Sequence, residues 1–188
     1  MKKFKVAVAG VTGAVGQEML KVLEERNFPV SELRPLASSR SQGKKVLFRG
    51  KEWTVEALSE NSFQGVDIAL FSAGASVSRE FAPLAAQSGC VVIDNSSAFR
   101  QDPDIPLIIP EINPHRIKDY SRRNIIANPN CTTTISLMPL KPLHDYGKIK
   151  RIIAASYQAT SGAGAEAMAE LEEQVRAYVN QEEIVPRV

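Results

Sequence analysis

Short apolar runs, which are typical of buried strands, alternate along the chain with segments whose apolar residues recur at the helical period. The runs predict strands at residues 4–9, 32–37, 67–71, 90–93, 125–127 and 149–156. The periodic segments predict helices at residues 13–26, 76–88, 132–143 and 163–179, the third kinked at Pro139. Strands that alternate with helices at this spacing indicate βαβ units, so we expect an α/β fold with a doubly wound, Rossmann-type parallel sheet.

Two shorter features interrupt this alternation. Residues 46–48 and 52–55 flank Arg49-Gly50-Lys51, which predicts a β-hairpin. Asn113-Pro114 predicts the start of a helical turn, because proline is favoured at the first helical position.

The composition excludes several classes of protein. A hydrophobic share of 44% with 23% charged residues is typical of a globular chain. The net charge is +2 and basic residues form no run, so we expect no nucleic-acid partner. No stretch approaches the ~20 apolar residues of a membrane span, and the short apolar run near the N-terminus lacks a signal-peptide cleavage site. We therefore expect a cytoplasmic protein with no membrane association and, from the spacing of its possible ligands, no metal.

Three glycines lie between the first predicted strand and the first predicted helix. Gly10, Gly13 and Gly16 form a Gly-x-x-Gly-x-x-Gly variant of the dinucleotide-binding fingerprint. They allow a tight turn and close approach of the backbone to a pyrophosphate, while the helix N-terminus offers free N–H groups. The alternative is that the glycines serve strand-to-helix packing only, but their position favours a dinucleotide site.

The end of the second predicted strand indicates which dinucleotide is bound. An NAD site usually has an Asp or Glu there, whereas this chain has Ala37-Ser38-Ser39-Arg40-Ser41. Arg40 can pair with a 2′-phosphate and Ser41 can donate to it, which predicts NADP. The alternative is a solvated Arg40 in a polar loop at residues 38–43.

Cys131 follows a short predicted strand and precedes a predicted helix. A helix N-terminus favours a thiolate, and its N–H groups can hold a developing oxyanion. Beside a nicotinamide cofactor, a thiolate can form a thioester that accepts a hydride. The alternatives are a buried, inert thiol, which is also our expectation for Cys90 in its apolar strand, or a disulfide between the two. Two cysteines do not make a disulfide scaffold, so a reducing compartment is favoured.

Five motifs, in this order, resemble those of aspartate-semialdehyde dehydrogenases and cover nearly the whole chain. They are Gly10-Val11-Thr12-Gly13-Ala14-Val15-Gly16, Ser39-Arg40-Ser41-x-Gly43, Asp94-Asn95-Ser96-Ser97-Ala98-Phe99-Arg100, Asn128-Pro129-Asn130-Cys131-Thr132-Thr133 and Ser156-Tyr157-Gln158-Ala159-Thr160-Ser161-Gly162-Ala163-Gly164. N-acetyl-gamma-glutamyl-phosphate reductases rank second, because they usually have Gly in place of Asn130.

The resemblance implies a role for each site residue. Cys131 would be the nucleophile, Arg100 would bind the acyl phosphate or inorganic phosphate, and Gln158 would contact the substrate. The cofactor residues would be Thr12, Gly13, Ala14 and Val15 along the dinucleotide, Arg40 and Ser41 at its 2′-phosphate, and Ser161 and Gly162 at its nicotinamide end. The residues alone leave alternatives open: Arg100 as a surface side chain, and residues 158–164 as a loop that caps the last helix.

The resemblance also implies the activity and the domains. The reaction would be reductive dephosphorylation of L-aspartyl-4-phosphate to L-aspartate-4-semialdehyde with NADPH, a step toward lysine, threonine, methionine and diaminopimelate, carried out by a homodimer. Residues 1–130 would be the NADP-binding Rossmann domain, and residues 131–188 the start of an α+β catalytic and dimerisation domain. Neither His115 nor His144 matches the family's catalytic His. We therefore expect a truncated chain that is inactive alone; the alternative is an NADP-binding fragment or module without turnover.

Overall fold

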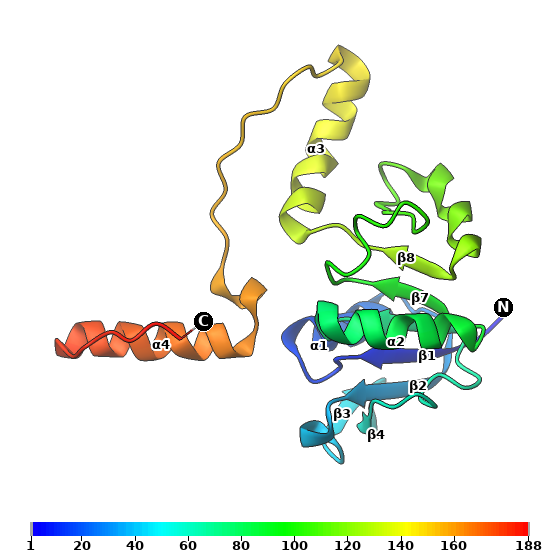
Figure 1. Cartoon of the computed structure of the whole chain (residues 1–188), viewed down its shortest axis with the longest axis horizontal. Helices are drawn as coiled ribbons and strands as arrows, with labels where there is room; N and C mark the ends of the chain where they lie inside the picture. The colour runs from blue at the N-terminus through cyan, green and yellow to red at the C-terminus, as the bar shows by residue number, and fades with distance from the viewer. Residues whose placement is uncertain (1, 188) are drawn as a thin grey trace. The chain divides into compact units, whose positions relative to one another are not determined.

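Six parallel strands form the central sheet of the computed structural model, which describes residues 2–187 (Figure 1). The chain divides into two compact units, Met1–Arg151 and Ile152–Val188, and the sheet belongs to the first. Its strands are β1 (Phe4–Ala9), β2 (Val30–Ala37), β5 (Glu56–Ala57), β6 (Ile68–Phe71), β7 (Val91–Asp94) and β8 (Ile125–Ala127). The spatial order is β5-β2-β1-β6-β7-β8, and every neighbouring pair is parallel. This order reverses between β1 and β6, which confirms the predicted doubly wound sheet.

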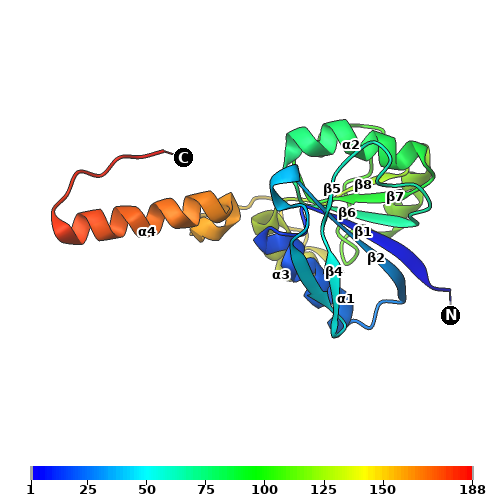
Figure 2. The same cartoon turned by 90° about the horizontal axis from the view of Figure 1, so that it is seen from below.

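Each face of the sheet is covered by a different helix. Figure 2 shows α2 (Ala75–Gln87) on one side of the strands and α1 (Ala14–Glu25) on the other. In β1, Ala7 and Ala9 belong to the core beneath α2, whereas Val6 and Val8 belong to the core beneath α1. This alternation follows from the period of two along a strand, and a strand buried on both faces has the continuous apolar run seen in the sequence.

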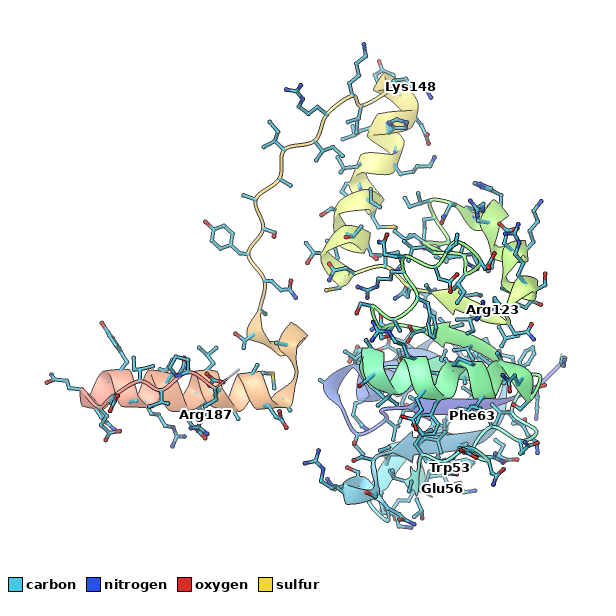
Figure 3. All side chains as sticks on the ribbon, in the orientation of Figure 1. Trp53, Glu56, Phe63, Arg123, Lys148 and Arg187 are labelled. Atoms are coloured by element: carbon cyan, nitrogen blue, oxygen red, sulfur yellow. The ribbon has the colours of Figure 1, made fainter. Side chains whose placement is uncertain are left out.

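The core beneath α2 is the larger and holds an aromatic pair. Phe63, labelled in Figure 3, is fully buried and stacks on Phe71 with ring centroids 5.5 Å apart. Ala82 and Ala85, three residues apart on α2, are fully buried against the same cluster. Small residues on the inner face of α2 therefore let the helix lie close to the sheet, leaving room for the two rings.

The remaining elements of the first unit lie outside the central sheet. The predicted hairpin is confirmed as β3 (Lys45–Phe48) and β4 (Lys51–Thr54). The 3₁₀ segment η1 (Ser39–Ser41) directly follows β2, and a second one, η2 (Pro114–Arg122), comes shortly before β8. The last helix of the unit, α3 (Cys131–Gly147), continues through both Pro139 and Pro142.

The second unit contains η3 (Thr160–Ala163) and α4 (Ala165–Asn180), which confirms the helix expected over residues 163–179. The chain then returns along α4, where the Arg187 N–H donates to the buried Glu170 Oε1 at 2.7 Å. Arg187, labelled in Figure 3, also pairs with Glu173 through its guanidinium.

One sequence expectation is wrong, and one strand of the structure was not predicted. The strand expected at residues 149–156 is wrong: the segment has no regular secondary structure, and Ile153 is 90% exposed. A strand needs a partner strand for its backbone hydrogen bonds, and no strand within residues 2–187 pairs with this segment. Conversely, the two-residue strand β5 is too short to leave a periodic pattern. The domain boundary between residues 130 and 131 stays a prediction.

Candidate active site

The glycine loop joins β1 to α1 where the sheet reverses its order. Gly10 has φ +86°, and a Cβ there would lie 2.4 Å from the Ser72 carbonyl oxygen at the end of β6. A Cβ on Gly16 would lie 2.3 Å from the Gly10 carbonyl oxygen. Close backbone packing therefore requires glycine at both positions. For Gly10 and Gly16, the alternative that the motif serves strand-to-helix packing is correct.

Gly13 has a different environment. Its nearest contact for a Cβ is the Gly10 carbonyl oxygen at 3.4 Å, and its φ of −78° suits any residue. It occupies the N-cap position of α1 without a side-chain cap, and Thr12, Gly13, Ala14 and Val15 are all exposed. The first turn of α1 holds no acidic residue. This exposed helix N-terminus is suited to an anion such as a pyrophosphate.

The other predicted cofactor residues lie beside this loop. Arg40 and Ser41 are in η1, directly after β2, and β2 is the neighbour of β1. The Thr12 hydroxyl donates to the Ser41 Oγ at 3.5 Å, so the glycine loop and η1 meet. Arg40 is exposed and makes no hydrogen bond or ion pair with the residues that the structure describes. A cation without a protein partner and a serine hydroxyl thus lie at one end of the glycine loop.

Cys131 is the first residue of α3 and is exposed, which excludes the buried, inert alternative. Asn130 caps the helix, and its Oδ1 accepts from the Thr132 N–H at 3.0 Å and the Thr133 N–H at 3.4 Å. Two of the N–H groups expected to be free at this end are therefore engaged by Asn130. The cap fixes the first turn of α3, and with it the position from which the thiol projects.

Cys90 differs from Cys131 in every respect. It is fully buried, it is not in a disulfide, and burial raises the pKa of its thiol to about 12, with the nearby Asp67 carboxylate adding to the rise. A thiol in this state is protonated and unreactive at neutral pH. This confirms the expectation of a structural Cys90 and excludes a disulfide with Cys131.

Arg100 is half-buried and oriented by two main-chain carbonyls. Its Nε donates to the Asn128 carbonyl at 2.9 Å, and its Nη2 donates to the Asn95 carbonyl at 3.1 Å. Its Nη1 makes no hydrogen bond within the described part of the chain. Because Asn128 lies three residues before Cys131, the structure connects the two residues that the sequence assigned to phosphate binding and to nucleophilic attack.

A buried polar cluster supports the loop that carries Arg100. Asp94, at the end of β7, is fully buried; its Oδ1 accepts from the Ser78 hydroxyl of α2 at 2.7 Å, and its Oδ2 accepts from the Ser96 hydroxyl at 2.7 Å. The Ser96 hydroxyl also accepts from the Ala98 N–H at 3.0 Å. Asp94, Asn95 and Asn128 were not predicted as functional residues, although polar residues at or directly after the ends of two strands were the available signal.

The second unit holds the other predicted residues. Gln158 lies on an exposed segment, and Ser161 and Gly162 are in η3. A Cβ on Gly162 would lie 2.4 Å from the Gln158 Nε2, so these two residues are in close contact within the unit. The predictions for these residues as substrate and nicotinamide contacts stay predictions.

Both histidines are exposed: His115 lies in η2 and His144 near the end of α3. Within residues 2–187, no group of three or more His, Cys, Asp or Glu side chains is arranged to hold a metal ion. No helix in the same range is both long and apolar enough to cross a membrane.

Residues 5–120 match the family model described as semialdehyde dehydrogenase, NAD binding domain. The chain belongs to the semialdehyde dehydrogenase family. A second model of this family, described as the semialdehyde dehydrogenase dimerisation domain, matches residues 140–188.

Relatives within the family confirm the resemblance predicted from the five motifs. The chain is 56% identical over 182 residues to an aspartate-semialdehyde dehydrogenase of Aquifex aeolicus, which covers 96% of this chain and 54% of that protein. A crystal structure of aspartate semialdehyde dehydrogenase II from Vibrio cholerae complexed with ASA has a TM-score of 0.95 at 49% identity, over 100% of this chain and 56% of that one. The Candida albicans enzyme solved with NADP has a TM-score of 0.65 at 26% identity, over 78% and 48%. The chain spans about half the length of the curated relatives that it matches.

Proposed function

We propose that this protein is an NADP-dependent aspartate-semialdehyde dehydrogenase that acts in the cytoplasm. It converts L-aspartyl-4-phosphate and NADPH to L-aspartate-4-semialdehyde, NADP and inorganic phosphate, on the route to lysine, threonine, methionine and diaminopimelate. The observation that carries the proposal is the exposed Cys131 at the start of α3, joined through the Asn128 carbonyl to the oriented Arg100. Relatives about half identical over nearly the whole chain support it.

The residues present fit an NADP molecule. Gly13, Ala14 and Val15 form the uncapped N-terminus of α1, which suits the pyrophosphate. Arg40 and Ser41 would hold the 2′-phosphate, since Arg40 has no partner among the described residues and β2 ends without an acidic side chain. When bound, NADPH supplies a hydride to the acyl group of the substrate. We propose Ser161 and Gly162 as its contacts at the nicotinamide end.

The protein side chains perform the acyl transfer. The Cys131 thiolate attacks the acyl carbon of aspartyl phosphate, and a thioester forms as the bond to the phosphate oxygen breaks. Arg100 binds the departing phosphate, with its Nε and Nη2 held by carbonyls and its Nη1 uncommitted. After reduction, the thiohemiacetal on Cys131 collapses to the semialdehyde and regenerates the thiolate. Gln158 would contact the substrate during these steps.

We propose that acid–base catalysis uses a group other than the two histidines of this chain. His144 lies thirteen residues beyond Cys131 on the same helix, which corresponds to about 20 Å along the helix axis. His115 is exposed on η2. We therefore propose that the 188-residue chain binds NADPH but does not turn over alone, and that the active form is a homodimer of a longer protein.

The test is phosphate-dependent reduction of NADP by L-aspartate-4-semialdehyde, followed by NADPH absorbance. A full-length protein is expected to show this activity, and Cys131→Ser is expected to abolish it without loss of NADPH binding. N-acetylglutamate semialdehyde serves as the control substrate and is expected to be inactive. Turnover with the control substrate alone would refute the substrate assignment, and robust turnover by the 188-residue chain would refute the proposal that this chain is inactive by itself.

A further inference from the structure

Two asparagine side chains join the loops that carry Arg100 and Cys131. Asn95 directly follows β7 and Asn128 directly follows β8, and these strands are neighbours in the sheet. The Asn128 Nδ2 donates to the Asn95 Oδ1 at 2.7 Å in a partly buried position. Hydrogen bonds between side chains are a minority in proteins, and this one joins residues thirty-three positions apart in the sequence.

The same two residues hold Arg100 through their main chains. Their carbonyl oxygens accept from the Arg100 Nε and Nη2, while their side chains bond to each other. The result is a closed ring of three residues. The N–H groups are anchored to the sheet, since Asn95 N–H donates to the Phe71 carbonyl and Asn128 N–H to the Asp94 carbonyl. The two carbonyls lie just beyond these anchors, where the amide bridge joins the two loops beside the hydrogen bonds that Arg100 makes to the same carbonyls.

We propose that Asn95 and Asn128 are positioning residues for Arg100, and that their amide bridge sets the direction in which the guanidinium meets the phosphate group. This inference rests on the proposed function. A guanidinium is a planar fork of donors, so two fixed acceptors along one edge of the group determine where the remaining donors point. Loss of the bridge lets the two carbonyls separate, and the free donors of Arg100 then turn away from the phosphate.

The test is a double-mutant cycle on a full-length protein. Asn95→Ala, Asn128→Ala and the double variant are compared for the KM of inorganic phosphate in semialdehyde oxidation. Each single variant is expected to raise this KM about five- to tenfold, the loss expected for one partly buried hydrogen bond, with the KM for NADP unchanged. The double variant is expected to be no worse than a single one, because either substitution alone breaks the same bridge.

Two further comparisons separate positioning from folding. Asn113→Ala is the matched control: its side chain also makes two hydrogen bonds to loop backbone, at 2.9 Å each, but none of the hydrogen bonds of the described residues joins it to Arg100. It is expected to lower the thermal midpoint without moving the phosphate KM. Asn95→Asp keeps an acceptor for Asn128, whereas Asn128→Asp adds the same charge and loses the donor, so Asn128→Asp is expected to raise the phosphate KM more.

The outcomes separate this inference from the proposed function. Multiplicative effects in the double variant, or an unchanged phosphate KM in all three variants of an active protein, would overturn the positioning role. An equal rise in Asn113→Ala would overturn it too, because general loosening of the loops would then explain the data. If the unmodified full-length protein shows no phosphate-dependent activity, the proposed function fails, and the inference that depends on it fails with it.

Discussion

Replacing Gly13 or Gly16 of the glycine loop by alanine distinguishes the glycine that the proposed binding site needs from the one that the fold needs. In Gly16→Ala the new Cβ would lie 2.3 Å from the Gly10 carbonyl oxygen and 2.7 Å from the Val11 Cα, both backbone atoms. The first distance is about 1.1 Å short of the 3.4 Å at which ordinary contact begins. In Gly13→Ala the Cβ would lie 3.4 Å from the Gly10 carbonyl oxygen, which is an ordinary van der Waals contact, beside the N-terminus of α1.

Gly16→Ala is expected to lower the stability of the fold, whereas Gly13→Ala is expected to weaken NADPH binding. For Gly16→Ala, overlap with rigid backbone costs about 3 kcal/mol, of which the higher helix propensity of alanine recovers about 1 kcal/mol, so the net loss is about 2 kcal/mol. For Gly13→Ala, alanine lowers the conformational entropy of the unfolded chain, which stabilises the fold, but it is a weaker N-cap than glycine. The two effects nearly cancel, and the free energy of unfolding stays within about 1 kcal/mol of that of the unmodified protein. Its Cβ meets the pyrophosphate instead, which weakens NADPH binding at least about tenfold.

The two variants are compared by urea unfolding, followed by circular dichroism, and by fluorescence titration with NADPH. A Gly13→Ala protein that unfolds as easily as Gly16→Ala would show that all three glycines serve packing. A Gly13→Ala protein that binds NADPH as tightly as the unmodified protein would remove the pyrophosphate from the N-terminus of α1. Either result refutes the division of roles within the loop.

Three further substitutions test other parts of the structure. Arg40→Ala is expected to weaken NADPH binding about tenfold while leaving NADH binding unchanged, as measured by titration with both cofactors. Asp94→Ala leaves buried serine hydroxyls without their acceptor and is expected to cost about 2–4 kcal/mol in urea unfolding; a loss below about 0.5 kcal/mol would contradict the buried cluster. Because burial raises the pKa of Cys90 to about 12 from a usual value of 9.0, the Cys90 thiol stays protonated to a higher pH in the folded state than in the unfolded state. Stability contributed by this thiol is therefore lost as the pH rises from about 9 towards 12, and Cys90→Ala is expected to flatten that decline. In native protein only Cys131 is expected to react with a thiol reagent at neutral pH, and both cysteines after denaturation.

Local patterns were sufficient to predict most of the first unit. The strands β1, β6 and β7 have continuous apolar runs because both of their faces are buried, and α1 and α2 show the helical period because one face is exposed. The place of Cys131 between a strand and a helix was also predictable from local patterns, whereas its exposure and the Asn130 cap are seen only in the structure.

Long-range pairing could not be predicted in this way. The bridge between Asn95 and Asn128 depends on β7 and β8 being neighbours in the sheet, and the residues are thirty-three positions apart. The error at residues 149–156 has the same origin: the apolar run records a preference for burial but not the availability of a partner strand. Cooperation between loops and the pairing of strands are properties of the assembled sheet rather than of any window of sequence.

The geometry of η1 has a consequence for engineering this protein. The turn is three residues long, its Arg40 is exposed, and main-chain bonds from the Ser41 N–H to the Ser38 carbonyl and from the Gln42 N–H to the Ser39 carbonyl close it. In the neighbouring glycine loop, Gly10 and Gly16 lie in close contact with other backbone atoms, so neither position has space for a Cβ. Redesign of the proposed coenzyme preference is therefore best directed at η1, where the exposed Arg40 can be replaced, because Gly10 and Gly16 of the glycine loop leave no space for a side chain.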